Sequence, residues 1–171
     1  MVSELVTRPT LDQVWDWLRA IPDPEIPVVS VVDLGIVRDV RWQGQELVVA
    51  ITPTYSGCPA TGVIALAIES ELLDRGVEKL RLERRLSPPW TTDWISAEGR
   101  RQLRAYGIAP PPETGAPVSL LDRFKRPSPA VQCPRCGSAD TVRVSAFGST
   151  PCKAQYRCQG CLEPFDQFKC I

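Results

Sequence analysis

The sequence predicts an α+β fold in two parts, a small domain of element order αββαβα followed by a smaller β-rich domain. Three observations support this prediction. Helix-like and strand-like apolar patterns alternate over residues 1–106, a proline-rich tract follows, and six of the seven cysteines lie after position 132. A chain of 171 residues suits one domain and a small module. We therefore expect domains at 1–106 and 131–171, joined by a linker at 107–130.

The first domain begins with a helix, because LDQVWDWLRAI, from Leu11, has apolar residues at helical spacing. Three prolines in PDPEIP end this helix. Two β-rich runs follow, LGIVRDVRW and ELVVAITP, and Gln43-Gly44-Gln45 between them predicts a hairpin turn.

A second helix is predicted over PATGVIALAIESELLDRG, with Gly76 as its C-terminal stop. The run VEKLRLERRL alternates apolar and charged residues, which indicates a half-buried strand. The break Pro88-Pro89-Trp90 precedes a last helix from Ser96 to Tyr106. These elements would form a small mixed or antiparallel sheet covered by helices.

The expected linker holds six of the seventeen prolines, which is typical of a semi-stiff spacer. Its interior VSLLDRF could dock on one of the domains, but we favour a solvated linker.

Charge and hydropathy exclude several classes of partner. Lys plus Arg and Asp plus Glu both total 20, so no net charge attracts nucleic acid or an anionic membrane. No apolar run reaches the roughly 20 residues of a membrane span, and MVSELVTRPT lacks the apolar core of a signal peptide. We expect a cytoplasmic protein with no nucleic-acid or membrane partner.

The tail carries two Cys-x2-Cys pairs, which in a reducing compartment are more typical of a metal site than of disulfides. Four thiolates in two such pairs suit one tetrahedral ion, and zinc is favoured over iron or an iron–sulfur cluster. The predicted ligands are Cys133, Cys136, Cys158 and Cys161.

Strand-like TVRVSAF, AQYRC and FDQFK would complete a three-stranded zinc ribbon, and a domain this small needs a crosslink to fold. Cys152 and Cys170 are left over. We interpret them as small buried residues, the alternative being that either one exchanges with a ligand or binds a transferred metal. The basic residues of the tail are scattered, which does not favour nucleic-acid binding.

The stretch TPTYSGCPATG holds Cys58, the one cysteine before position 133. The chain has no histidine, which excludes Ser-His and Cys-His pairs, Rieske ligation and the Glu-x-x-His di-iron motif. If Pro59 occupies the first helical position, Cys58 is the N-cap, and the helix terminus stabilises its thiolate. A buried small cysteine is the alternative.

Oxygen ligands could accompany this sulfur. Asp23 and Glu25 lie in the proline-stiffened DPE loop, and Thr52 and Thr54 lie just before Cys58. Carboxylates beside a thiolate would form a mixed oxygen and sulfur site suited to iron. A turn residue, a helix cap or a solvated charge is the alternative interpretation of each carboxylate.

The motifs PDPEIPVVSVVDLGIV, TPTYSGCPAT and SPPWTTDWIS resemble, in this order, the MIP-type domain of cytosolic iron–sulfur assembly factors and the bacterial SufT proteins. With the tail motifs CPRCGS and STPCKAQYRCQGCLEPFDQFKC, the whole chain resembles the PaaD family. Members of that family are accessory subunits encoded with the bacterial phenylacetyl-CoA ring 1,2-epoxidase.

The resemblance implies an assembly-type domain whose reactive cysteine is Cys58. Asp23, Glu25, Thr52 and Thr54 also match motif positions, with a weaker claim to a ligand role. The resemblance further implies that the protein is a non-enzymatic accessory or maturation factor in phenylacetate catabolism. Such a factor would assist insertion of an iron–sulfur or iron centre into an oxygenase or reductase subunit of the epoxidase.

Under this hypothesis Cys58 holds iron or a cluster transiently, and a homodimer could supply a second sulfur. The alternative is a non-catalytic structural or docking subunit of the oxygenase. A thiol hydrolase is disfavoured, because no base that could activate Cys58 is visible.

Overall fold

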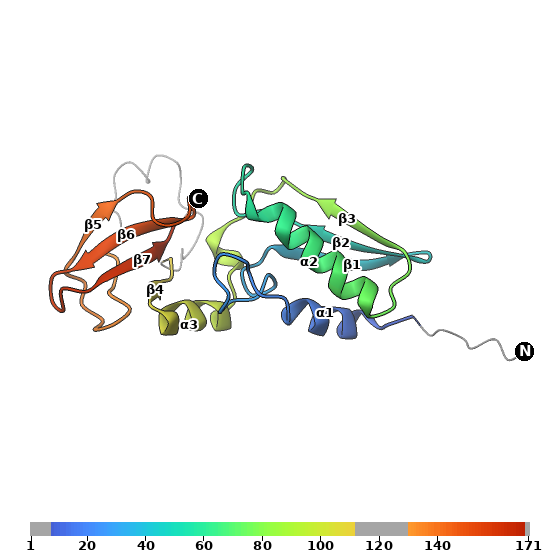
Figure 1. The fold of residues 1–171 in the computed structure, drawn as a ribbon, viewed down its shortest axis with the longest axis horizontal. Helices are drawn as coiled ribbons and strands as arrows, with labels where there is room; N and C mark the ends of the chain where they lie inside the picture. The colour runs from blue at the N-terminus through green and yellow to red at the C-terminus, as the bar shows by residue number, and fades with distance from the viewer. Residues whose placement is uncertain (1–7, 112–129, 170–171) are drawn as a thin grey trace, which may run out of the picture. The chain divides into compact units, whose positions relative to one another are not determined.

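The computed structural model describes residues 8–111 and 130–169, and the chain forms two compact units, Met1–Trp90 and Thr91–Ile171 (Figure 1). The predicted α+β class and the order αββαβα are confirmed. The first unit contains α1 (Leu11–Arg19), β1 (Val37–Gln43), β2 (Glu46–Ile51), α2 (Ala60–Asp74) and β3 (Leu80–Arg84).

Helix α1 begins at a capping box. The Thr10 hydroxyl accepts a hydrogen bond from the Gln13 amide, and the Gln13 side chain accepts one from the Thr10 amide. Val14 and Leu18 are fully buried on its inner face. The helix ends at Arg19, just before the proline-rich turn, as the sequence predicts.

The sheet of the first unit is mixed and has the order β1-β2-β3. β1 and β2 form an antiparallel hairpin, whose turn includes Gly44 with a φ of 61°, whereas β3 runs parallel to β2. Every residue of β2 from Leu47 to Ile51 is buried, because β2 is the central strand. α1 contacts β1 and α2, and α2 contacts β3, so the two helices cover one face of the sheet (Figure 1).

Helix α2 is apolar on both its inner and its outer side. Ile64, Ile68 and Leu72 face the core and are at most 3% exposed. Gly76, with a φ of 88°, stops the helix where the sequence predicts. Apolar side chains also occupy the outer side, where three are more than half exposed, namely Val63, Leu66 and Leu73. We call these three residues the outer face of α2.

The second unit begins with η1 (Thr92–Trp94) and α3 (Ala97–Tyr106), and α3 is capped by the Ser96 hydroxyl. Its sheet contains β4 (Ile108–Ala109), β5 (Thr141–Ser145), β6 (Lys153–Cys158) and β7 (Pro164–Phe168), in the order β4-β7-β6-β5. β5, β6 and β7 are antiparallel and form the three-stranded ribbon that the sequence predicts.

The border between the compact units lies after Trp90, whereas the sequence places it after residue 106. The difference arises at Ile108 and Ala109, which the sequence assigns to the linker. Both are buried and pair in parallel with β7, and Ala109 joins the ribbon core, so α3 is tied to the ribbon. The rest of the predicted linker, residues 112–129, lies outside the described residues. No helix in the described ranges is long and apolar enough to cross a membrane.

Candidate functional site

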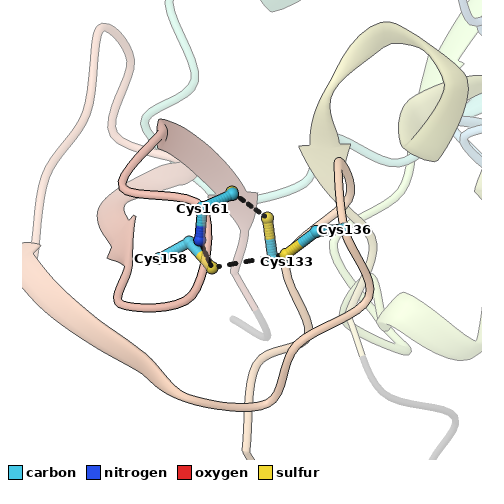
Figure 2. A group of neighbouring side chains, drawn as sticks. All are labelled: Cys133, Cys136, Cys158 and Cys161. Carbon is cyan, nitrogen blue, oxygen red and sulfur yellow. Dashed lines mark hydrogen bonds between the residues drawn. The ribbon is translucent and has the colours of Figure 1, made fainter.

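Four cysteine side chains of the second unit point toward one another, two from the turn before β5 and two from the end of β6 and the turn after it (Figure 2). Their Sγ atoms all lie within 4.8 Å of one another. The Sγ atoms of Cys133 and Cys161 are 3.8 Å apart, and those of Cys136 and Cys158 are 3.5 Å apart. A tetrahedron with metal–sulfur bonds of about 2.3 Å has sulfur–sulfur edges of about 3.8 Å. The group therefore fits a single tetrahedral ion.

Backbone hydrogen bonds within the protein shape both cysteine turns. In the first, the Gly137 amide donates to the Cys133 carbonyl, and Gly137 takes a positive φ of 76°. In the second, the Cys158 amide donates to the Glu163 carbonyl, and Leu162 takes a positive φ of 64°. Each pair of cysteines is thus followed by a residue with left-handed backbone.

The sulfurs differ in how readily they ionise. A hydrogen bond from the Cys161 amide, together with the neighbouring Cys136, lowers the pKa of Cys158 to about 7. The Glu163 amide lowers the pKa of Cys161, but burial and the neighbouring sulfurs outweigh it and raise that pKa to about 12. Four thiolates this close repel one another, so full ionisation requires a bound cation.

The structure brings together all four predicted ligands, Cys133, Cys136, Cys158 and Cys161. The site is closed by protein sulfur, which is typical of structural ions, and the thiolates fit zinc or a single iron ion. A cluster containing inorganic sulfide would hold its cysteine sulfurs further apart. Cys152 is buried with its Sγ 3.1 Å from Thr150 Oγ1 and is not in this group, and Cys170 lies outside the described residues.

Cys58 lies in the loop between β2 and α2 and is partly exposed. Helix α2 begins at Ala60 with Pro59 as its N-cap, one residue later than predicted. Pro59 already has helical backbone dihedrals. The Thr61 amide donates a hydrogen bond to the Cys58 carbonyl at this end of the helix. The Cys58 sulfur therefore adjoins the helix start without capping it, and it has no hydrogen-bond partner in the described part of the chain.

Hydrogen bonds fix the loop around this cysteine. The Cys58 amide donates to the Tyr55 carbonyl, and the Arg84 guanidinium donates to the Ser56 carbonyl at 2.7 Å. Thr52 and Thr54 are buried where the chain leaves β2. One residue that sequence reasoning missed is Thr61, whose hydroxyl is buried in the first turn of α2 without a partner among the described residues. No sequence signal marks it, because burial is a tertiary property.

Asp23 acts as a turn residue. Its carboxylate accepts hydrogen bonds from the amides of Glu25, at 2.9 Å, and Ile26, at 2.8 Å, and it is 6% exposed. Across residues 8–111 and 130–169, the four cysteines of the ribbon are the one group of three or more Cys, Asp or Glu placed to share an ion. Cys58, Asp23 and Glu25 therefore do not form a preassembled three-ligand site.

Two family descriptions match this chain. Residues 11–78 match "Iron-sulfur cluster assembly protein", and residues 122–169 match "PaaD zinc beta ribbon domain". A crystal structure of a domain of unknown function, DUF59, from Bacillus anthracis is 28% identical, with a TM-score of 0.50, over 54% of this chain and 89% of that chain. A conserved hypothetical protein of Thermotoga maritima is 30% identical, with a TM-score of 0.49, over 58% of this chain and 98% of that one.

A curated relative spans nearly the whole chain. It is a protein of Escherichia coli that is provisionally named as one of the subunits of 1,2-phenylacetyl-CoA epoxidase, and the two are 46% identical over 166 residues. The match covers 97% of this chain and 96% of the relative. The closed four-cysteine site agrees with the ribbon match, and the partly exposed Cys58 lies within the assembly-protein match. This chain, an iron–sulfur cluster assembly domain followed by a zinc β-ribbon, therefore belongs to the PaaD family.

Proposed function

We propose that this protein is a non-catalytic maturation factor that helps insert an iron–sulfur or iron centre into a subunit of a phenylacetyl-CoA oxygenase. The observation that carries the proposal is the partly exposed Cys58 beside the start of α2, which belongs to no group of three or more Cys, Asp or Glu side chains in the described part of the chain. A site with one protein sulfur binds a metal weakly and can release it, whereas a closed site retains its ion. The name of the Escherichia coli relative supports the oxygenase as the client.

Zinc is the ion that we assign to the four-cysteine site, where its role is structural. It would hold the two loops of the ribbon together, and the small core of this sheet supports the same role. That core consists of four buried residues, Ala109, Cys133, Cys158 and Phe165. Since two of the four are ligands, the ion and the core stabilise each other.

The experiment that tests the transfer role replaces Cys58 with serine, which keeps the size of the side chain and removes the thiolate. We expect the client oxygenase to lose most of its iron and activity in cells that contain only Cys58→Ser. The matched control is Cys152→Ala, a thiol outside both sites, which should leave the client iron unchanged. Metal analysis of the purified client gives the measurement. Full iron loading by Cys58→Ser would refute the proposal, and zinc should persist in both variants.

The outer face of α2 is the surface that we assign to the client. A client that takes a metal from Cys58 must approach the start of α2, and the outer face of α2 begins there, with Val63 about one turn beyond Ala60. Glu69 lies between Leu66 and Leu73 on this side of the helix, so this face carries one partly buried carboxylate among its apolar side chains. Exposed apolar patches of this kind often mark protein interfaces.

Leu66→Glu tests this surface without touching the thiol. Leu66 is 66% exposed, so the substitution should leave the melting temperature within about 2 °C, since surface changes alter stability by roughly 0.5 kcal/mol or less. We expect client iron to fall as it does in Cys58→Ser. Leu86→Glu, at a residue with 56% exposure outside α2, is the control. Equal client iron with the unaltered protein, Leu66→Glu and Leu86→Glu would exclude the outer face of α2 as the contact with the client.

A structural subunit of the oxygenase is the second candidate, and the word "subunit" in the name of the relative favours it. This role predicts that the protein copurifies with the oxygenase in fixed stoichiometry. It also predicts that Cys58→Ser leaves oxygenase activity unchanged. The Cys58→Ser experiment therefore separates the two candidates.

A further inference from the structure

A cavity of about 590 Å³ lies within the second unit, between α3 and the segments that enter and leave the ribbon. This volume is within the range of about 300–1,000 Å³ that is usual for small-molecule sites. Arg100, Arg101 and Arg104 of α3 line it, together with the apolar side chains of Pro111 and Val131 and the amide of Gln167. None of the described lining residues is acidic. We call this the α3 cavity.

The three arginines differ in how their charges are compensated. Arg101 pairs with Glu98, one turn earlier in α3. Arg100 donates to the backbone carbonyls of Thr92 and Pro111, both at 2.6 Å, which position the guanidinium but do not neutralise it. The Arg104 side chain is exposed and has no hydrogen-bond or ion-pair partner among the described residues. Among the described residues, no carboxylate therefore neutralises Arg100 or Arg104.

The helix alone does not account for this arrangement. Arg104 lies in the last turn of α3, where a cation interacts favourably with the helix dipole. However, Arg100 and Arg104 are four residues apart on the same helix, and like charges at this spacing destabilise a helix. An anion bound between them would remove that repulsion. Arginine is the residue best suited to hold such an anion, because its planar guanidinium donates paired hydrogen bonds to phosphate or carboxylate oxygens.

We propose that the α3 cavity binds a small phosphorylated ligand. A phosphate carries close to two negative charges near neutral pH, which matches the two uncompensated arginines. Arg100 and Arg104 would hold the phosphoryl oxygens, and Pro111 and Val131 would contact a less polar part of the ligand. The cavity is concave and of small-molecule size, and the chain has no net charge, so a nucleic acid is not the ligand that it fits. This site is independent of Cys58.

The test is calorimetric titration of the full chain, with its metal bound, using pyrophosphate and ADP as separate probes. We expect ADP to bind with a dissociation constant below about 1 mM and to bind more weakly as salt is raised. Arg104→Ala should weaken binding at least tenfold. Arg143→Ala removes another exposed arginine of the same unit, outside the cavity, and should bind as the unaltered protein does. Pyrophosphate as tight as ADP would assign the site to free phosphates rather than nucleotides.

A second variant tests the cavity itself and leaves every arginine in place. Ala97 is an exposed lining residue at the start of α3, so Ala97→Trp should fill part of the space and abolish ADP binding without unfolding the unit. Circular dichroism checks the fold of each variant. No binding of either probe at 5–10 mM, on the order of the weakest useful affinity, would overturn the proposal. The proposal would also be overturned if Arg104→Ala and Arg143→Ala lost equal affinity for ADP, or if Ala97→Trp bound ADP as the unaltered protein does.

Discussion

Leu162 is the one residue other than glycine with a positive φ in the part of the chain that the structure describes. It follows Cys161 with a φ of 64°, in a region that an L-residue other than glycine rarely adopts, and it is 58% exposed. The equivalent position after Cys136 is Gly137, for which this conformation is free of strain. The ribbon thus needs left-handed backbone after each pair of ligands, and the sequence meets that need with glycine in only one case.

Substitutions at these two positions should have opposite effects on stability. Leu162→Gly should raise the free energy of unfolding by about 0.5–1 kcal/mol, because it removes the left-handed strain. Gly137→Ala should lower it by about 1 kcal/mol through strain alone, because no atom lies within 4 Å of the added carbon. Thermal unfolding of the metal-bound protein measures both. A loss of stability in Leu162→Gly would mean that the exposed side chain contributes a contact larger than the strain.

At the scale of elements, the sheet of the first unit has one apolar face and one charged face. The register places Asp39 and Glu83 on either side of the buried Ala50, on the face opposite the helices. Arg41 and Arg85 each form ion pairs with both of these carboxylates. The four charges therefore form a network that links the two edge strands. It lies across Ala50 of the central strand β2, which is uncharged.

This network makes the first unit sensitive to acid. Hydrogen bonds from Arg85 and then Arg41 lower the pKa of Glu83 from 4.5 to about 2. Because the folded pKa lies below the unfolded one, the stabilisation is complete above about pH 4.5 and is lost as the pH falls through about 2. Glu83→Gln should therefore lower the melting temperature at pH 7, and the difference from the unaltered protein should shrink toward pH 2.

The control for this prediction is Glu78→Gln, which removes an exposed carboxylate that forms no ion pair among the described residues. Its melting temperature should follow that of the unaltered protein at every pH. A gap between Glu83→Gln and the unaltered protein that stays constant from pH 7 to pH 2 would contradict the assignment.

At the scale of the whole molecule, the two units are stabilised by different means. The first has a core of helix and sheet side chains, including the fully buried Leu18, Leu47 and Ile68. The ribbon has a small core in which cysteine ligands take the place of large apolar side chains. A sheet this small cannot bury enough apolar surface by itself, so its fold should depend on the ion.

Metal removal should therefore unfold the second unit and leave the first intact. With a strong chelator, we expect hydrogen exchange to become fast in β5–β7 while β2 and α2 stay protected. Cys158→Ser should have the same effect without a chelator, because it removes one ligand. Loss of protection in β2 under either condition would show that the units fold as one.

Features that follow from local residue patterns were predictable without the structure. Apolar spacing sets α1, α2 and the strands, and Gly76 ends α2 because its left-handed backbone is available at no cost. The four ribbon ligands were also predictable, because two Cys-x2-Cys pairs can satisfy one tetrahedral ion with little freedom in how they do so.

Features that depend on contacts between distant residues were not predictable from these local patterns. Ile108 and Ala109 became a strand because β7 offered them an unpaired edge, which no local signal reveals. Asp23 forms a turn because the nearby amides of Glu25 and Ile26 donate hydrogen bonds to its carboxylate, and the sequence did not show which of its alternative roles this loop would use. The α3 cavity likewise exists only because α3 and the ribbon segments are brought together, and a cavity has no signature in the order of residues.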